Sequence, residues 1–311
     1  MNNKKIAIIG GGPWGDALAS VFARDSGDII QFSRNANKNP ISVNIKITND
    51  FSDLKDRDYI LMVVPAQKTR DCCAELKKHI GGSCSLIICS KGIEVETGKL
   101  LSEVASEYFP KESVSVLSGP NFAKEIIDQK PAMSSLASYN TETARQIASD
   151  LSNEKLNLYP TDNIVAVQIF GALKNVLAIL CGFARGLSFG ENEMSALIVK
   201  GISEIGKMAS ERGNVAPSLV APGCIGDVIL TCTSKTSRNT RYGMSLSNKT
   251  LEKQSGDGIT QTNIEGIKTI MALSNLDLAN YPLLDFSVDL LSKKHSKTSS
   301  LERKFRNLLF S

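Results

Sequence analysis

The stretch that decides the fold is Lys5-Ile-Ala-Ile-Ile-Gly-Gly-Gly-Pro-Trp-Gly15, in which an apolar run ends at glycines. The apolar run has the composition of a buried strand, and a helical pattern follows over Trp14–Arg24. Between them, Gly10, Gly12 and Gly15 satisfy G-x-G-x-x-G. Such glycines permit a tight turn, close approach of the backbone to a diphosphate, and close packing of helix on strand. The stretch predicts a dinucleotide-binding turn; a nucleotide fold without bound cofactor is the alternative.

The residues around this turn bear on which dinucleotide binds. Pro13 lies at the helix start, where its missing N–H has no helical partner to lose. The next expected strand ends in Phe32-Ser33-Arg34, with no carboxylate to hold a ribose 2′-hydroxyl. Arg34 can pair with a 2′-phosphate, which favours NADPH over NADH. The alternative is that Arg34 stacks on adenine or faces solvent.

Short β-rich runs alternate with helix-length segments through the first half of the chain. This alternation predicts helical crossovers and an α/β fold, a Rossmann-type doubly wound parallel sheet. The expected strands are Lys5–Ile9, Ile29–Phe32, Tyr59–Val63, Leu86–Cys89, Val114–Leu117, Met133–Ala137 and Lys155–Tyr159.

The second half has a different pattern, because helical periodicity continues there without intervening strands. The clearest helical segments are Ile164–Cys181, Glu193–Arg212 and Ile264–Ser274. We therefore expect two domains, an NAD(P)-binding Rossmann domain over residues 1–160 and an all-α substrate and catalytic domain over residues 161–311.

Composition excludes several classes of protein. A net charge of +4 over 311 residues is too small to indicate nucleic-acid binding. The seven cysteines are odd in number and form no C-x-x-C pair, so we expect reduced thiols in a cytoplasmic protein and no metal site. No apolar stretch is expected to reach the length of a membrane span. The two histidines lie in polar stretches, so a lysine or carboxylate must carry any proton transfer.

Two lysines are candidates for that role. Lys91 follows an expected strand, and the carboxyl ends of strands in a doubly wound sheet face the ligand. The turn Ser118–Ala123 follows the next strand and presents backbone N–H groups to the same edge. Lys174 lies inside a strongly apolar helix, where desolvation and a second cation such as Lys91 would favour a neutral amine that accepts a proton from an alcohol. The alternatives are a structural cap for Lys91 and a surface position for the Lys174 amine.

Two further groups of polar residues accompany these lysines. Asp227 and Thr231 are four residues apart, on one face of an expected helix. Ser237-Arg238-Asn239 follows them, and an arginine beside hydroxyl and amide donors suits a phosphate monoester.

Together these pieces resemble the bacterial form of the NAD(P)-dependent glycerol-3-phosphate dehydrogenase family, and they run through nearly the whole chain in the family's order. The matching segments are Gly10–Gly15, Val63-Val-Pro65, Ser90-Lys-Gly92, Glu96-Thr-Gly98, Ser118-Gly-Pro120, Phe122-Ala-Lys-Glu125, Gly171–Asn175, Gly226-Asp227, Leu230-Thr-Cys232, Ser237-Arg-Asn239 and Glu265-Gly266.

The resemblance implies a role for each site residue. Lys174 would be the general acid/base, Lys91 would touch substrate and nicotinamide, and Asp227 would orient Lys174 or the substrate hydroxyls. The remaining substrate contacts would be Gly119, Asn121, Asn175, Thr231, Ser237, Arg238 and Asn239. The cofactor contacts would be Gly10, Gly12, Pro13, Trp14, Gly15, Arg34, Lys91, Ala123, Arg238, Asn263 and Glu265.

The implied reaction interconverts dihydroxyacetone phosphate and sn-glycerol 3-phosphate with NADPH or NADH, and supplies glycerol 3-phosphate for phospholipid synthesis. The partner would be a phosphorylated small molecule, with no nucleic acid and no integral membrane contact, and a homodimer is compatible with the resemblance. The chain departs from the family pattern at Pro13, Asn121, Phe170 and Lys200, and in a shortened stretch over residues 35–49.

Two alternatives remain open at this stage. A lysine-dependent β-hydroxy-acid dehydrogenase would grip a carboxylate and act on 3-hydroxy acids. A catalytically silent NADPH-binding sensor would bind cofactor without oxidising it.

Overall fold

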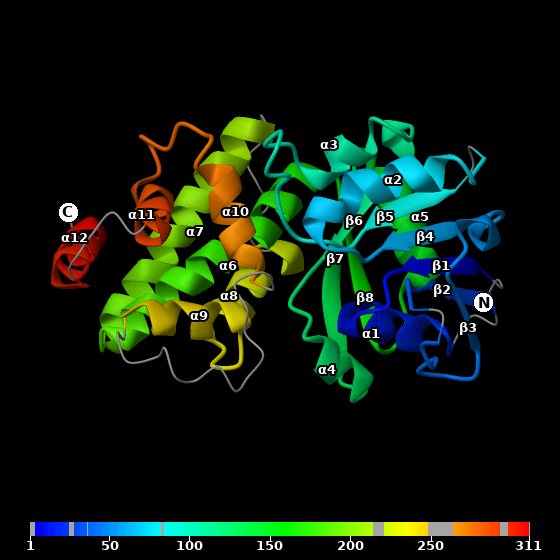
Figure 1. Ribbon diagram of the computed structural model, residues 1–311, viewed down its shortest axis with the longest axis horizontal. Helices are drawn as coiled ribbons and strands as arrows, with labels where there is room; N and C mark the ends of the chain where they lie inside the picture. The colour runs from blue at the N-terminus through cyan, green and yellow to red at the C-terminus, as the bar shows by residue number, and fades with distance from the viewer. Residues whose placement is uncertain are drawn as a thin grey trace. The chain divides into compact units, whose positions relative to one another are not determined.

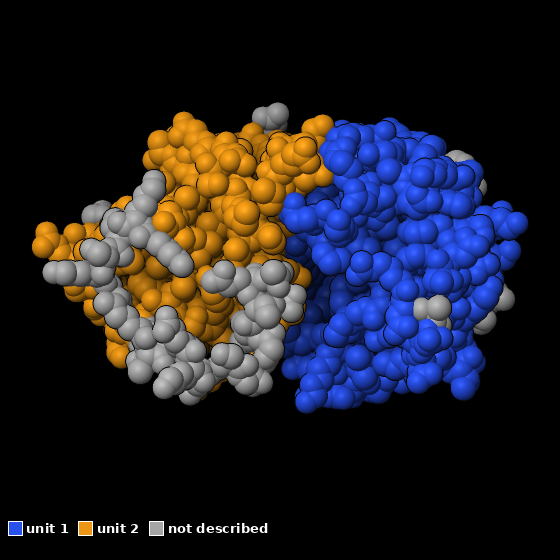
Figure 2. All heavy atoms as spheres, in the orientation of Figure 1, with its two compact units in different colours: residues 1–91, 100–168, 221–223 blue, residues 92–99, 169–220, 224–311 orange. Residues whose placement is uncertain are grey.

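The chain forms two compact units, coloured separately in Figure 2. The computed structural model describes residues 4–24, 28–35, 37–81, 84–213, 221–247, 264–292 and 298–310. The first unit comprises Met1–Lys91, Leu100–Gln168 and Ala221–Gly223, and the second comprises Gly92–Lys99, Ile169–Val220 and Cys224–Ser311. Neither unit is therefore one continuous stretch of chain, and the expected domains 1–160 and 161–311 stay a prediction.

An eight-stranded sheet forms the centre of the first unit, in the order β3-β2-β1-β4-β5-β6-β7-β8 (Figure 1). Its strands are β1 (Lys5–Ile9), β2 (Asp28–Phe32), β3 (Ile45–Thr48), β4 (Tyr59–Met62), β5 (Ser85–Ile88), β6 (Val114–Ser118), β7 (Ala132–Ser138) and β8 (Leu156–Thr161). The helices of this unit are α1 (Pro13–Phe22), α2 (Thr69–Lys77), α3 (Leu101–Ala105), α4 (Ala123–Ile127) and α5 (Thr141–Leu151), followed by the first turns of α6 (Ile164–Gly186).

The Rossmann-type α/β fold is confirmed, and the expectation of an all-parallel sheet is wrong at two strands, β7 and β8, which run opposite to the other six. β7 runs antiparallel to β6, whereas β8 is parallel to β7. The direction changes once, at the connection that contains the five-residue α4, and the connection through the eleven residues of α5 is again a parallel crossover.

The sequence patterns also missed β3, which pairs in parallel with β2 at the sheet edge. Ile45 is buried and Lys46 is exposed, so the alternation of a strand is present. The strand has only four residues and follows a polar stretch, and a pattern this short cannot be told from a loop by periodicity.

The central strands β1, β4 and β5 are buried over most of their length, because helices cover both faces of the sheet. In register, Ile6 of β1 lies beside Ile29 of β2 and Tyr59 of β4. Helix α1 packs on this core through Ala17, Leu18 and Val21. The parallel strands therefore end at one edge, where the glycine turn and the turns after β2, β5 and β6 lie.

In the second unit the described regular elements are helices, and the described segment Gly92–Lys99 is a turn that joins them from the first half of the chain. Its helices are the remainder of α6, α7 (Glu191–Gly213), α8 (Asp227–Thr233), α9 (Arg238–Ser247), α10 (Glu265–Leu273), α11 (Pro282–Leu291) and α12 (Thr298–Phe310). The π-helical turn Pro222–Gly226 directly precedes α8, and its residues from Cys224 onward belong to this unit. Its core contains a cluster of rings in which Phe286 and Phe305 stack with centroids 4.7 Å apart, and Phe183 packs on both. This cluster joins α12 to α11 and α6.

Helix α6 corrects a second expectation. Its 23 residues are long and apolar enough to cross a membrane, with a mean hydropathy of 2.0, although no span was expected. Within the protein, 94% of that apolar window is buried. Its apolar surface is therefore covered by the protein's own helices.

Candidate active site

The turn after β1 is built so that only glycine fits at its two ends. Gly10 has φ of +146°, and a Cβ there would lie 2.3 Å from the carbonyl oxygen of Val63. A Cβ on Gly15 would lie 2.1 Å from the carbonyl oxygen of Gly10. Both obstacles are backbone atoms, which cannot move aside as a side chain can. The two glycines therefore set the close packing of turn, strand and helix.

The middle of the same turn is open at Gly12. A Cβ on Gly12 would meet no atom within 4 Å, so this part of the turn leaves room for a ligand. Pro13 occupies the start of α1, and the first hydrogen bond into the helix is from Asp16 N to Gly12 O. The N–H groups of Trp14 and Gly15 precede that bond and point out of the helix end. Trp14 itself is partly buried against the core of the unit.

A polar network that the sequence patterns did not indicate lies behind the turn. The Gln31 amide nitrogen donates to Gly10 O at 2.9 Å and to Asp16 Oδ1 at 2.8 Å. Lys38 Nζ donates to Asp16 Oδ2 at 2.9 Å. Gln31 is fully buried in β2, where its neighbours are apolar, and a glutamine in such a run was the available signal. The network joins the glycine turn, β2 and the loop after β2.

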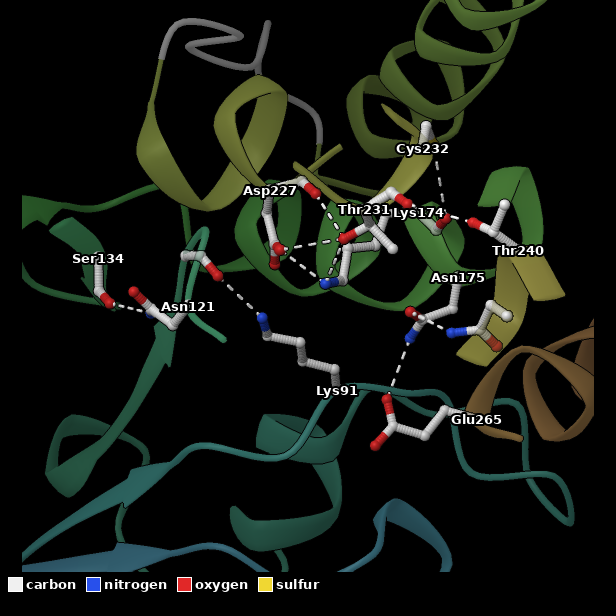
Figure 3. Close-up of polar contacts among 12 residues, drawn as sticks. Lys91, Asn121, Ser134, Lys174, Asn175, Asp227, Thr231, Cys232, Thr240 and Glu265 are labelled. Atoms are coloured by element: carbon white, nitrogen blue, oxygen red, sulfur yellow. Dashed lines mark hydrogen bonds and ion pairs between the residues drawn. The ribbon is translucent and has the colours of Figure 1, made fainter. Parts of the chain in front are cut away.

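The turns after the other strands carry the remaining predicted residues of the first unit. Arg34 follows β2 and is exposed. Lys91 follows β5, and its amine donates to Gly119 O at 3.0 Å (Figure 3). The Asn121 amide nitrogen donates to Ser134 Oγ at 2.5 Å, while its buried Oδ1 accepts no bond from the described protein. Ala123 begins α4. Lys91 thus binds the turn after β6, as parallel strand ends would bring it to do.

In the second unit a buried ammonium has two oxygen partners from one helix face (Figure 3). Lys174 Nζ donates to Asp227 Oδ1 at 2.6 Å and to Thr231 Oγ1 at 2.9 Å. The Thr231 hydroxyl donates its own proton to Asp227 O at 2.7 Å, so it presents lone pairs to the lysine. Lys174 is 8% exposed and Asp227 is 1% exposed. An ion pair removed from water in this way holds both side chains in one geometry.

This pairing changes the sequence-based interpretation of Lys174. The amine does not reach the surface by itself, and a carboxylate rather than a second cation is its neighbour within the unit. Both partners accept N–H bonds from the amine, so Asp227 and Thr231 fix the position of Lys174 Nζ.

Two buried thiols lie behind this pair. Cys232 Sγ is 3.9 Å from Lys174 O. Its hydrogen bond with Cys181, together with burial, holds the pKa of the Cys232 thiol well above its usual range. Burial likewise raises the pKa of Cys224 to about 12. These two thiols therefore stay protonated near pH 7.

A network of amides surrounds Asn175, the residue after the lysine. Its Nδ2 donates to Glu265 Oε2 at 3.2 Å, and its Oδ1 accepts from Asn239 Nδ2 at 2.9 Å. Asn239 Oδ1 in turn accepts from Gly266 N at 3.1 Å. Three helices far apart in the sequence, α6, α9 and α10, are joined by these bonds.

Close contact of α9 with α6 places the start of α9. A Cβ on Gly182 would lie 2.0 Å from Thr240 O, and one on Gly243 would lie 1.9 Å from Ile179 O. Ser237 Oγ accepts from Thr240 N at 3.4 Å, while Arg238 at the first position of the helix is exposed. Arg238 is thus an accessible cation beside the buried Asn239.

The predicted residues therefore form two groups, each coherent within its unit. The first unit holds the glycine turn with Pro13 and Trp14, Arg34, Lys91, Gly119, Asn121 and Ala123. The second unit holds Lys174, Asn175, Asp227, Thr231, Ser237, Arg238, Asn239 and Glu265. The structure joins Lys174, Asp227 and Thr231 directly, while Arg34 and Arg238 stand exposed. Asn263 lies outside the described residues.

Known proteins match both halves of the chain. Residues 5–144 match the family model described as NAD-dependent glycerol-3-phosphate dehydrogenase N-terminus, and residues 163–302 match the model described as its C-terminus. A protein of Roseobacter denitrificans named glycerol-3-phosphate dehydrogenase [NAD(P)+] is 38% identical over 256 residues, which are 78% of this chain and 80% of that protein. A protein of the same name from Neorickettsia sennetsu is 35% identical over 87% of this chain and 85% of its own length.

A solved structure is similar over its full length. The crystal structure of glycerol-3-phosphate dehydrogenase from Coxiella burnetii has a TM-score of 0.87, with 28% sequence identity, and the match covers 99% of each chain.

Proposed function

This chain belongs to the NAD-dependent glycerol-3-phosphate dehydrogenase family, and we propose from that premise that it is an oxidoreductase that interconverts dihydroxyacetone phosphate and sn-glycerol 3-phosphate. The observation that carries the proposal is the buried amine of Lys174, a residue of α6. Its Nζ lies 2.6 Å from Oδ1 of Asp227, which is on α8. Reduction of a ketone needs a proton at oxygen as well as a hydride at carbon, and this amine is built to supply the proton.

Lys174 carries the proton step in this proposal. When bound, NAD(P)H supplies the hydride for the carbonyl carbon. The Lys174 ammonium donates its proton to the ketone oxygen as that oxygen gains negative charge, and the neutral amine takes the proton back in the oxidation direction. Asp227 and Thr231 keep the amine from rotating, so the proton leaves along one direction.

In each unit, the donors that the family resemblance implies are assigned to the phosphorylated substrate. In the second, Ser237, Arg238 and Asn239 hold the phosphate, with Arg238 as the charged donor. In the first, Lys91, Gly119 and Asn121 line the substrate end. The buried Oδ1 of Asn121, which accepts no bond from the described protein, supports this role, because a substrate hydroxyl can satisfy it.

The cofactor is assigned to the glycine turn, with Gly10, Gly12 and Gly15 shaping the backbone around the diphosphate. The other proposed contacts are Pro13, Trp14, Arg34, Lys91, Ala123, Arg238, Asn263 and Glu265. NADPH is preferred over NADH in this proposal, because the exposed Arg34 follows β2 where a carboxylate would otherwise meet the ribose. We also infer a cytoplasmic enzyme that supplies glycerol 3-phosphate for phospholipid synthesis and assembles as a homodimer.

An absorbance assay at the nicotinamide band tests the proposal. We expect dihydroxyacetone phosphate to be reduced with both cofactors, and with a higher kcat/KM for NADPH. Oxidation of NADPH by a 3-keto acid, with none by dihydroxyacetone phosphate, would instead identify a β-hydroxy-acid dehydrogenase. Binding of NADPH without turnover of either substrate would identify a sensor.

A further inference from the structure

We propose that Lys38 is a second cation for the 2′-phosphate of NADPH and determines cofactor choice together with Arg34. This inference rests on the proposed function, since it concerns the dinucleotide site of that enzyme. No sequence pattern indicates Lys38, because it lies in the polar stretch after β2. Its position in the fold is what assigns the role.

The local backbone turns Lys38 back toward the glycine turn. Asn37 N donates to Asn35 Oδ1 at 3.1 Å, and Lys38 N donates to Asn35 O at 3.2 Å. These bonds reverse the chain directly after Arg34, as an asparagine-initiated turn does. Two cations four residues apart are thus carried on one tight loop at the end of β2.

The stem of Lys38 then lies against the backbone of the dinucleotide turn. A Cβ on Gly11 would be 3.3 Å from Lys38 Cδ and 2.6 Å from Ser33 Oγ. Gly11, Ser33 and Lys38 are therefore immediate neighbours. In a Rossmann fold the adenine ribose lies between the first glycines and the end of the second strand, which are the two segments that these residues join.

The ammonium is held in this position by a chain of hydrogen bonds that ends on the buried Gln31. Lys38 Nζ binds Asp16 Oδ2 at 2.9 Å, and Asp16 Oδ1 accepts from Gln31, which is fully buried and also binds Gly10 O. The side chains of Lys38 and Asp16 remain 17% and 21% exposed, so the pair is ordered but open to a ligand. A lysine offers three N–H donors, and Asp16 uses one of them.

The ion pair with Asp16 also allows a second role for Lys38, and an experiment has to distinguish it from direct contact with the 2′-phosphate. A carboxylate in the first turn of α1 stands near the proposed diphosphate site, so Lys38 could act only by neutralising it. Neutralisation would favour every dinucleotide equally. Direct contact with a 2′-phosphate would favour only ligands that carry that phosphate.

Calorimetric titration with ADP-ribose and 2′-phospho-ADP-ribose tests the inference without turnover. In the wild type we expect tighter binding of the 2′-phosphorylated ligand. Lys38→Gln should weaken that ligand about 10-fold, the effect of losing one charge-assisted hydrogen bond, and change ADP-ribose affinity by less than about 2-fold. Arg34→Ala should act in the same direction. The matched control is Lys46→Gln, which removes an exposed lysine of β3 and should leave both affinities unchanged.

The double variant Asp16→Asn with Lys38→Gln separates the two roles. Binding of 2′-phospho-ADP-ribose that stays weak supports direct contact, and binding restored to the wild-type level overturns it. Equal weakening of both ligands by Lys38→Gln, or no weakening of either, overturns the inference as well. If Arg34→Ala alone abolishes discrimination, only the role of Lys38 fails. If wild-type protein binds neither ligand, the proposed dinucleotide function itself fails.

Discussion

The two functional regions of this protein are built from different materials. The proposed cofactor region of the first unit is mainly backbone: a glycine turn, a helix end and strand ends. The proposed catalytic region of the second unit is made of side chains: an ammonium with a carboxylate and a hydroxyl on a buried helix face. Backbone can cradle a diphosphate through N–H groups, but it cannot exchange a proton near neutral pH. The division of labour follows from that difference.

Removal of the Lys174 amine tests the proposed catalytic region and should have the largest effect on kcat. We expect Lys174→Ala to lower kcat roughly 10²- to 10⁴-fold, the usual contribution of a general acid. ADP-ribose binding should stay near the wild-type value, because the glycine turn is in the other unit. Lys207→Ala, an exposed lysine of α7, is the matched control. A Lys174 variant that keeps half its turnover would remove this residue from the proton step.

Arg238 tests whether the second unit also grips the phosphate. Arg238→Ala should raise KM for dihydroxyacetone phosphate about 10- to 100-fold, the effect of losing a charge-assisted phosphate contact. Steady-state kinetics measure this, with Arg303→Ala as an exposed arginine control on α12. A rise in the substrate KM that is matched by an equal rise in the Kd for ADP-ribose would show that Arg238 serves mainly the cofactor.

A pair of glycine variants sharpens the cofactor side. Gly15→Ala forces a Cβ to 2.1 Å from a backbone oxygen, and we expect a loss of about 1–3 kcal/mol in the free energy of unfolding. Gly12→Ala places its Cβ in open space, so unfolding should change by less than about 1 kcal/mol. Its methyl group would instead obstruct the diphosphate and weaken ADP-ribose binding about 10-fold. Urea unfolding and calorimetry separate the two; the same profile for both variants would contradict the distinction.

Glu204 provides the smallest effect, and it concerns stability alone. This buried carboxylate accepts from Leu283 N at 2.9 Å and from Leu284 N at 3.1 Å, and so satisfies the start of α11. Glu204→Gln keeps one acceptor oxygen and should cost about 0.5–1.5 kcal/mol. Burial raises the pKa of Glu204 although both bonds oppose the shift. Because its pKa is higher in the folded protein than in the unfolded chain, Glu204 contributes to the free energy of unfolding when it is protonated. That contribution is lost as pH rises above about 4.5 and through the folded-state pKa.

The glutamine variant does not titrate, so the difference between wild type and Glu204→Gln isolates this carboxylate. We expect the stability advantage of wild type over the variant to shrink as pH rises through that window. Urea unfolding at a series of pH values measures the difference. An advantage that grows with pH would mean that the hydrogen bonds outweigh burial.

Local patterns carried most of the fold and much of the site. The strand before Gly10, the glycine spacing and the helical periodicity around Lys174 each depend on neighbours in sequence, so they are legible without coordinates. The four-residue β3 and the direction of β7 and β8 were not, because a short strand has too little periodicity and strand direction is set by pairing with a distant strand. Lys38 was missed for a related reason, since its partner Asp16 is 22 residues away.

The sequence by itself determined which residues can do chemistry: three glycines that admit a diphosphate, and a lysine and an aspartate in apolar helices. Only the tertiary structure decided which of them meet. The contact of Lys174 with Asp227 crosses 53 residues and depends on the packing of α6 and α8, while Lys38 depends on a turn that returns it to Gly11. Periodicity is a property of consecutive residues, whereas a bond between distant side chains exists only after a core has formed to hold both of them in place.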